Sequence, residues 1–356
     1  MRAQEDYAAR IRGAWQGRIS GCMLGKAVER FSMQEGHQAL TGYLQAVEAL
    51  PLRDYIPFDA EHAPEVLYTP CCRGRMHSSL PDDDINYSVL ALMMLEQHGN
   101  DLNTTDVARA WLTHLPLAST YTAERAAYRI LLSKGREWFP EGQELGFDIA
   151  ECADNPFNDW IGAQIRADVY GWVCPGDPAK AAHLAHQDAA LSHREDGIYG
   201  AVYVAALGAL LVDGADINSA IESALAFIPG DSRCAAVVAQ AQALADDAEG
   251  GDRIRESFGD MSVVHTVNNL GLVVWALQRH QEDFDAAIGD VVAAGLDTDC
   301  NGATVGALWA LQGKDIPAHW LTPWQERVGV SLAGIAELPL DELVTRTIAV
   351  KEKLGS

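Results

Sequence analysis

The sequence has little positive charge. Lysine and arginine number 26 against 50 aspartates and glutamates, so the formal net charge is −24 at pH 7. A field of this sign repels nucleic acid and anionic membrane surfaces, and we expect neither as a partner. It favours a cationic partner or a metal ion instead.

Paired cysteines and long apolar segments are also scarce. The seven cysteines are an odd number, no Cys-x-x-Cys pair occurs, and Cys71 and Cys72 are adjacent, which argues against a disulfide framework. Reduced thiols and an N-terminus without an apolar signal-peptide core predict a cytoplasmic protein. The longest nearly apolar run, 197–212, is too short and too rich in glycine for a membrane span, so we expect a buried helix there.

Alternation of apolar and polar residues, the pattern of strands, is absent over any useful length. Helical periodicity recurs instead, and 48% of the residues are hydrophobic, which excludes a disordered chain. The sequence therefore predicts an all-α fold, with one compact domain over residues 1–356. The predicted helices are 5–30, 83–98, 104–114, 121–135, 179–192, 198–212, 216–227, 232–248, 264–280, 283–294, 301–312 and 340–354.

The segment 51–82, the longest without a clear helical pattern, ends in an acidic cluster. Asp82, Asp83 and Asp84 are consecutive, and an apolar helix follows at once. One aspartate is enough to cap that helix, whereas three adjacent carboxylates repel one another. Helix capping, a solvated surface and metal binding all account for this cluster when it is taken alone.

A second acidic pair, Asp297 and Asp299, precedes a helix with Gly302 and Gly306 on one face. The first predicted helix carries a similar glycine stripe at positions 17, 21 and 25. Such stripes let two backbones approach closely, which predicts that the acidic residues lie deep in the molecule. Buried carboxylates need compensation, and a set of hard oxygen ligands favours Mg²⁺ or Mn²⁺ over Zn²⁺. Two neighbouring ions suit five carboxylates from two clusters.

Three motifs occur in a recognisable order. A glycine-spaced helix reads GCMLGKAVE, ending at Glu29; the run 82–85, DDDI, begins another helix; and DTDC at 297–300 precedes NGATVGAL and later KDIPAHWL. Over about residues 8–322, this pattern resembles the ADP-ribosylglycohydrolase family, typified by the hydrolase that restores dinitrogen reductase.

The resemblance implies a compact orthogonal bundle of helices with a binuclear Mg²⁺ site. The implied metal ligands are Asp82, Asp83, Asp84, Asp297 and Asp299. Asp299 would bridge the two ions, and Glu29 would correspond to the family's flexible glutamate near the scissile bond. The segment LSHREDGIYGAVYVA resembles the family's histidine loop, which implies that His193 and Gly197 contact the substrate.

Such enzymes cleave N- or O-glycosidic bonds to the anomeric carbon of ADP-ribose, so an ADP-ribosylated protein or a small ribosylated molecule is the implied partner. Breaking this bond builds an oxocarbenium-like charge on the ribose. Glu29, Asp83 and Asp84 all suit the role of a general base that takes a proton from water or a ribose hydroxyl.

Three positions depart from the family pattern. Cys300 replaces a threonine that is a metal ligand in the family, Asp82 also stands in place of a threonine, and Lys26 stands where an aspartate is common. A neutral thiol is a poor ligand for Mg²⁺, so the preferred metal or its occupancy changes. These departures favour a different substrate, and they admit two alternatives: a catalytically silent ADP-ribose or riboside-binding protein, and a hydrolase of a small nucleoside-like metabolite.

The segment NPFNDW has two interpretations. Asn155 and Asn158 suit a network of Asx turns, and they also suit a loop that contacts the substrate. Other candidates are weaker. His183 and His186 share a helix face without a third ligand, the thiols of Cys71 and Cys72 lack a partner histidine, and Trp160, Tyr170 and Trp172 are expected in the core.

Overall fold

A computed structural model describes residues 2–135 and 145–355. These residues form 16 α-helices, seven short 3-10 helices and one two-stranded antiparallel sheet, which confirms the all-α prediction. The α-helices are α1 (Arg2–Lys26), α2 (Glu29–Ala46), α3 (Asp83–His98), α4 (Thr104–His114), α5 (Thr122–Lys134), α6 (Asp168–Trp172), α7 (Pro178–Ala189), α8 (Glu195–Val212), α9 (Ile217–Ala224), α10 (Arg233–Ala243), α11 (Gly250–Ser257), α12 (Thr266–Arg279), α13 (Phe284–Ala293), α14 (Thr298–Ala310), α15 (Ala318–Leu321) and α16 (Leu340–Leu354). The 3-10 helices are η1 (Thr69–Cys71), η2 (Gly99–Asp101), η3 (Leu117–Ser119), η4 (Ile149–Ala153), η5 (Ile161–Arg166), η6 (Leu225–Phe227) and η7 (Thr322–Trp324), and the strands are β1 (Arg327–Leu332) and β2 (Ile335–Pro339).

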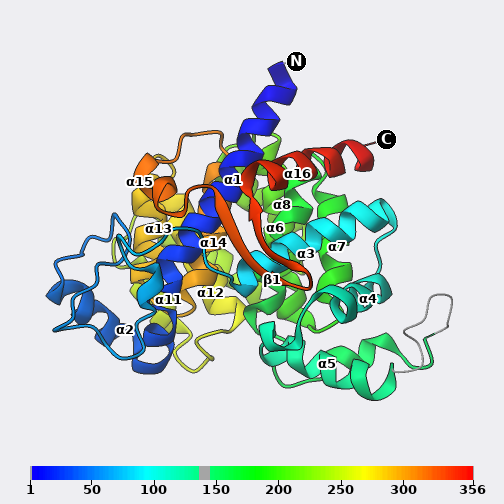
Figure 1. The fold of residues 1–356 in the computed structure, drawn as a ribbon, viewed down its shortest axis with the longest axis horizontal. Helices are drawn as coiled ribbons and strands as arrows, with labels where there is room; N and C mark the ends of the chain where they lie inside the picture. Colours follow the sequence, from blue (N-terminus) through cyan, green and yellow to red (C-terminus); the bar gives the residue numbers. More distant parts are fainter. Residues whose placement is uncertain (1, 136–144, 356) are drawn as a thin grey trace.

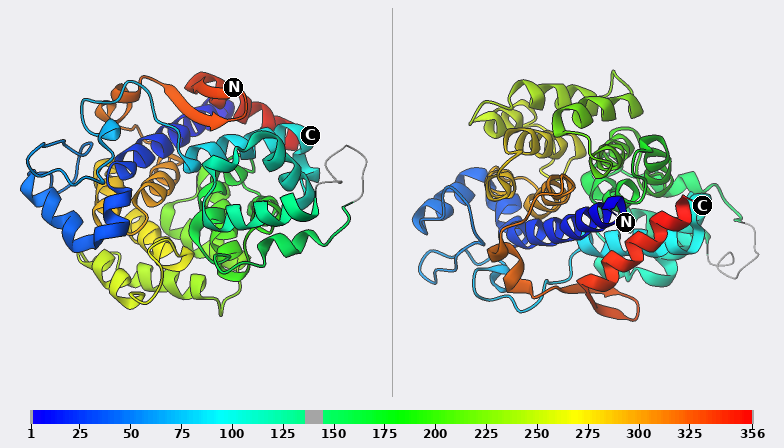
Figure 2. Two further views of the ribbon diagram at one scale, coloured as in Figure 1. Left: turned by 60° about the horizontal axis from the view of Figure 1, so that its bottom comes forward. Right: turned by 90° about the horizontal axis from the view of Figure 1, so that it is seen from above.

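Helices α1 and α14 form the central pair of the molecule. They lie side by side through its middle in Figures 1 and 2, and their mutual contact is the most extensive between any two described elements. The α1 face that meets α14 carries glycines at positions 17, 21 and 25, where a Cβ atom would stand within 2.1 Å of a backbone oxygen of α14. Each glycine stripe was predicted to let another backbone approach closely, and the structure shows that the two stripes meet each other.

Helix α8 is the centre of the second half of the fold. It packs against α6, α7 and η5, while α12 packs against both α10 and α14. By length and composition α8 resembles a membrane span, yet 83% of its 18 residues are buried inside the fold. This burial agrees with the predicted core helix.

Several predicted boundaries were wrong. The first helix does not run to residue 30: it ends at Lys26, a turn follows, and a new helix begins at Glu29. The rest of α2 was missed because its sequence is polar, and its axis breaks at Gly36, where φ is 82°. The helix expected at 301–312 begins earlier, at Thr298, which places Asp297 at its N-cap.

The strands β1 and β2 were also missed. They pair in antiparallel register, with Val328 opposite Leu338, and an irregularity follows Gly329. Each strand has only six or five residues, which is too short for the alternating pattern to stand out. The prediction of a single domain stays a prediction.

Candidate functional site

The candidate site is formed where two helices begin with acidic residues. Asp82 is the N-cap of α3, and its Oδ1 accepts a hydrogen bond from the backbone N of Asp84 at 3.0 Å. Asp297 is the N-cap of α14, and Asp299 lies in the first turn. The positive end of each helix dipole therefore faces its carboxylates and offsets part of their charge.

The C-terminal end of α1 packs directly against the first turn of α14. The Thr298 hydroxyl donates to the carbonyl oxygen of Gly25 at 2.8 Å, and a Cβ on Gly25 would lie 2.1 Å from the Thr298 carbonyl oxygen. The chain then turns into α2, so Glu29 comes to lie beside Asp297 and Asp299. Packing of glycine backbones thus sets the geometry of the acidic residues.

The two acidic clusters converge, as the sequence predicted. Their side chains form three groups in which the ligand atoms all lie within 4.8 Å of one another. The groups are Glu29, Asp297 and Asp299; Asp84, Asp299 and Cys300; and Cys22, Asp82 and Asp84. Asp299 and Asp84 each belong to two groups, so the three are continuous. Asp83 stands outside them and is half-buried, as is Glu29.

Burial perturbs most of these carboxyl groups. Desolvation, followed by the charge of Asp299, raises the pKa of Glu29 and of Asp297 well above the usual range. The pKa of Asp84 is likewise raised by desolvation, although Arg18 opposes the change. Desolvation and the charge of Asp82 raise the pKa of Asp299 to about 6. Without a bound cation, these buried carboxyl groups therefore keep their protons to a higher pH than carboxyl groups on the surface do.

Two basic side chains of α1 compensate part of this charge. Arg18 is fully buried and lies 3.2 Å from Asp84 Oδ1 and 2.9 Å from Asp168 Oδ2. Lys26 Nζ lies 2.5 Å from Asp82 Oδ2. Burial alone would raise the pKa of Asp82, but the Lys26 ammonium, together with hydrogen bonds from Lys26, from the backbone N–H of Asp84 and from Cys22, lowers it.

These cations, with Cys22, were missed as parts of the site. Positions 18, 22 and 26 follow one another at intervals of four, which places them on one face of α1. That spacing was visible in the sequence, and it is the signal that marks Arg18, Cys22 and Lys26 as neighbours of the acidic centre.

Three carboxylate oxygens in the centre have no partner among the described residues. They are Asp84 Oδ2, Asp297 Oδ1 and Asp299 Oδ1, and the three residues are at most 5% exposed. An unpaired buried acceptor costs free energy, and several of them facing one another cost more. The donor set therefore fits a divalent cation, which accepts several oxygen ligands at once.

The predicted substrate histidine lies inside the protein. His193 is fully buried, and its Nδ1 is 2.8 Å from Ser192 Oγ, which in turn accepts from Arg166 at 2.9 Å. Desolvation and the nearby Arg166 charge lower the pKa of His193 well below its usual value, so the imidazole is neutral. A contact between His193 and a substrate stays a prediction.

Arg166 is the centre of a second buried network. Its Nη1 lies 2.8 Å from Glu124 Oε1 and its Nε lies 2.6 Å from Asp188 Oδ1. Tyr170 also donates to Asp188, at 2.6 Å. The network joins α5, α6, α7 and η5, and η5 packs against α3.

The NPFNDW segment forms one Asx turn, at Asn155, in line with one of its two interpretations. Asn155 Oδ1 accepts from the backbone N of Phe157 at 2.9 Å, and its amide donates to the Ser192 carbonyl at 3.0 Å. The Asn158 side-chain amide donates to the Ala153 carbonyl oxygen at 3.0 Å. A Cβ on Gly197 would lie 2.2 Å from the backbone carbonyl oxygen of Asn158. These residues fix the loop against α8, and their role in substrate binding stays a prediction.

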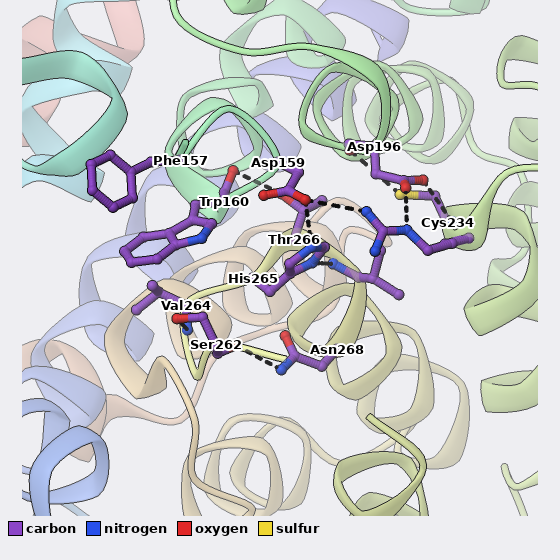
Figure 3. A network of polar contacts seen from close by, with 12 residues as sticks. Phe157, Asp159, Trp160, Asp196, Cys234, Ser262, Val264, His265, Thr266 and Asn268 are labelled. Carbon is purple, nitrogen blue, oxygen red and sulfur yellow. Dashed lines mark hydrogen bonds and ion pairs between the residues drawn. The ribbon is translucent and has the colours of Figure 1, made fainter. Parts of the chain in front are cut away.

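The same loop continues into the polar network of Figure 3. Asp159 Oδ2 lies 3.0 Å from His265 Nε2 and 3.2 Å from Arg233 Nη2. Arg233 Nε reaches Asp196 Oδ2 at 2.7 Å, and Asp196 also accepts from the backbone N of Cys234 at 3.1 Å. The network ties the loop to the first turns of α8, α10 and α12.

The weaker candidates stay structural. All seven cysteines are free and buried. Desolvation raises the pKa of Cys71 and of Cys72, so neither is an activated thiolate. Tyr170 and Trp172 are fully buried core residues as predicted, whereas Trp160 is half-buried and packs edge-on against Phe157 at 4.7 Å between ring centroids.

Comparisons with known proteins support the family resemblance and the fold. A family model described as ADP-ribosylglycohydrolase matches residues 3–351. Among solved structures, one titled "ADP-ribosylglycohydrolase-related protein complex" is similar with a TM-score of 0.60 and 18% sequence identity, over 98% of this chain and 99% of that one. At this identity the structural likeness supports the fold alone. No curated protein matches the chain.

Proposed function

The chain belongs to the ADP-ribosylglycohydrolase family, and on that premise we propose that it hydrolyses the glycosidic bond of an ADP-ribosylated or related N-ribosyl substrate in a metal-dependent reaction. The observation that carries the proposal is the meeting of Asp84 and Asp299 within 4.8 Å, each with an unpartnered buried oxygen. Asp84, Asp297 and Asp299 would be the main ligands of the ion or ions, and Asp82 and Asp83, the other predicted ligands, would lie beside them. Mg²⁺ is the first candidate and Mn²⁺ the alternative. We also propose a cytoplasmic location, which the free cysteines support.

Bound divalent ions would supply fixed positive charge that orients the ribose hydroxyls and a water molecule. The protein's own residues prepare the site for this. Asp84 is held by Arg18, and Asp299 is held by the first turn of α14, so neither carboxylate has to be reorganised when the substrate binds. Preorganised charge of this kind contributes much of the rate in such hydrolyses.

Glu29 and Asp83 are the proposed proton-transfer groups. Both are half-buried, whereas Asp84 is fully buried and paired with Arg18. Desolvation raises the pKa of Glu29 and of Asp83, with neighbouring carboxylates adding to the effect. A carboxylate with a raised pKa is a stronger base once it is deprotonated, and a bound cation would favour the deprotonated form. One of these two groups would then remove the proton from the attacking water. The ring charge that develops in the transition state is stabilised by the remaining negative charge of the centre.

The test is a hydrolysis screen with purified protein. ADP-ribosylated peptides, free ADP-ribose derivatives and small N-ribosides are incubated with Mg²⁺, with Mn²⁺ and with EDTA, and released ADP-ribose or ribose is measured. We expect turnover that requires a divalent ion and that is lost in Asp299→Asn. The matched control Asp290→Asn changes an aspartate paired with Arg53 and His280 away from the centre, and it should stay active.

Two outcomes count against hydrolysis. Unchanged turnover in Asp299→Asn would contradict the assigned centre. Calorimetric binding of ADP-ribose with no hydrolysis across the whole panel would favour a silent binding protein on the same scaffold.

A further inference from the structure

The three ligand groups of the centre differ in donor chemistry. Glu29, Asp297 and Asp299 offer only oxygen, whereas the group of Asp84 and Asp299 includes the sulfur of Cys300 within the same 4.8 Å. Cys300 lies in the first turn of α14, is 5% exposed and forms no disulfide. A thiol among carboxylates changes which metal ions the group prefers, because sulfur and oxygen ligands select different ions.

Unpartnered atoms mark this sulfur-containing group as a ligand position. Asp84 is fully buried, and its Oδ2 has no hydrogen-bond partner among the described residues. Asp299 is 2% exposed, and its Oδ1 likewise has no hydrogen-bond partner among them. Asp84 Oδ1, by contrast, accepts from Arg18. The Arg18 contact therefore leaves one oxygen of Asp84 available beside the Cys300 thiol.

Building on the proposed metal centre, we propose that the sulfur of Cys300 makes one cation position chemically distinct from the oxygen position at Asp297 and Asp299, which lies beside Glu29. The mixed position is formed by Asp84, Asp299 and the sulfur of Cys300, and it takes a divalent ion with affinity for thiolate, such as Zn²⁺ or Co²⁺, in preference to Mg²⁺. On binding, the Cys300 thiol releases its proton to solvent and the sulfur donates a lone pair to the ion.

The group of Cys22, Asp82 and Asp84 does not form a second mixed position. Lys26 Nζ lies 2.5 Å from Asp82 Oδ2 and already supplies a positive charge there. The Asp82 carboxylate also caps α3 through its other oxygen. Cys22 therefore faces one compensated carboxylate, Asp82, besides Asp84, while Cys300 faces Asp84 and Asp299, each with a free oxygen.

The experiment is a Co²⁺ titration followed by absorption spectroscopy on the full chain. Coordination by sulfur gives a sulfur-to-cobalt charge-transfer band in the near ultraviolet, which coordination by oxygen alone does not give. Three variants are compared: Cys300→Ser, Cys22→Ser and the matched control Cys234→Ser, a buried cysteine that contacts Asp196 away from the centre. Circular dichroism of each variant establishes that it is folded.

We expect the band in the wild type, in Cys22→Ser and in Cys234→Ser, and its loss in Cys300→Ser. We also expect calorimetric Zn²⁺ affinity to fall by about tenfold or more in Cys300→Ser, while Mg²⁺ affinity changes by less than about twofold because the oxygen position is intact. Absence of the band from cobalt-saturated wild type, or its loss only in Cys22→Ser, would overturn the inference.

These results separate the inference from the proposed function. Metal-dependent hydrolysis without a sulfur band would leave the function standing and remove the mixed position. A sulfur band without hydrolysis of any riboside would leave the mixed position standing and remove the function.

Discussion

A Cβ atom on Gly21 would stand 1.9 Å from the carbonyl oxygen of Gly302, and one on Gly302 would stand 2.4 Å from the carbonyl oxygen of Gly21. The two backbones therefore touch at a point where no side chain fits. Asp299 lies less than one turn before Gly302, so the spacing of α1 and α14 also sets the position of the acidic centre.

Gly21→Ala should destabilise the protein by about 3 kcal/mol or more, because the added methyl group meets backbone that cannot move aside cheaply. The matched control is Gly42→Ala in α2, an exposed helical glycine with open space around it. It should be neutral or stabilising by up to about 1 kcal/mol. Chemical denaturation measures both, and equal effects would show that the backbones are not in contact.

The buried Arg18 predicts a second large loss. Arg18→Met leaves Asp84 and Asp168 buried without their counter-charge, which should cost about 3–5 kcal/mol. Arg12→Met, at an exposed pair with Glu326, should cost less than about 1 kcal/mol. Urea denaturation compares the two, and a mild effect at Arg18 would place its carboxylate partners in contact with solvent.

Stability of the metal-free protein should fall as pH rises. The pKa of Asp299 is raised to about 6 by desolvation and by Asp82, from an ordinary unfolded value of about 4. A raised pKa means that the folded state binds the proton more tightly. Its contribution is complete below about pH 4 and is lost by about pH 6, a change of roughly 3 kcal/mol.

Thermal unfolding in EDTA checks this sign. We expect Tm to decrease between pH 5 and pH 7, and we expect Mg²⁺ or Mn²⁺ to raise Tm more at pH 7, where the carboxylates are ionised. Asp299→Asn should flatten both dependences. A Tm that rises over this range in EDTA and ignores added metal would contradict the assignment.

Glu29→Gln and Asp83→Asn distinguish the two proposed proton-transfer groups. Loss of a general base should lower kcat by about 10²–10⁴-fold with little change in KM. The other variant should alter metal affinity or KM more than kcat, since its carboxylate would serve binding. Comparable kcat in both variants and the wild type would show that neither group transfers the proton.

Some elements were predictable because their local signals were strong. Helices 83–98, 104–114 and 340–354 have the predicted bounds. The first is capped by Asp82, and the second by an Asn103 capping box. The glycine stripes predicted close helix contacts and deep burial of the acidic clusters, and the α1–α14 pair has both. Each of these signals is written in adjacent residues or at helical spacing.

The rest depends on contacts between distant segments. Nothing local indicates that Arg166 meets Glu124, or that Arg233 joins Asp159 to Asp196. Glu29 was expected at the end of a helix, and it begins one instead, because the turn after Lys26 is a consequence of packing. The long-range networks therefore required the folded chain.

Diffraction from crystals soaked with Mn²⁺, recorded for its anomalous signal, tests the central claim most directly. The account predicts anomalous peaks in the acidic centre between the first turns of α3 and α14, in contact with Asp299. Ordered manganese elsewhere in the same crystals, with no peak at Asp299, would contradict it.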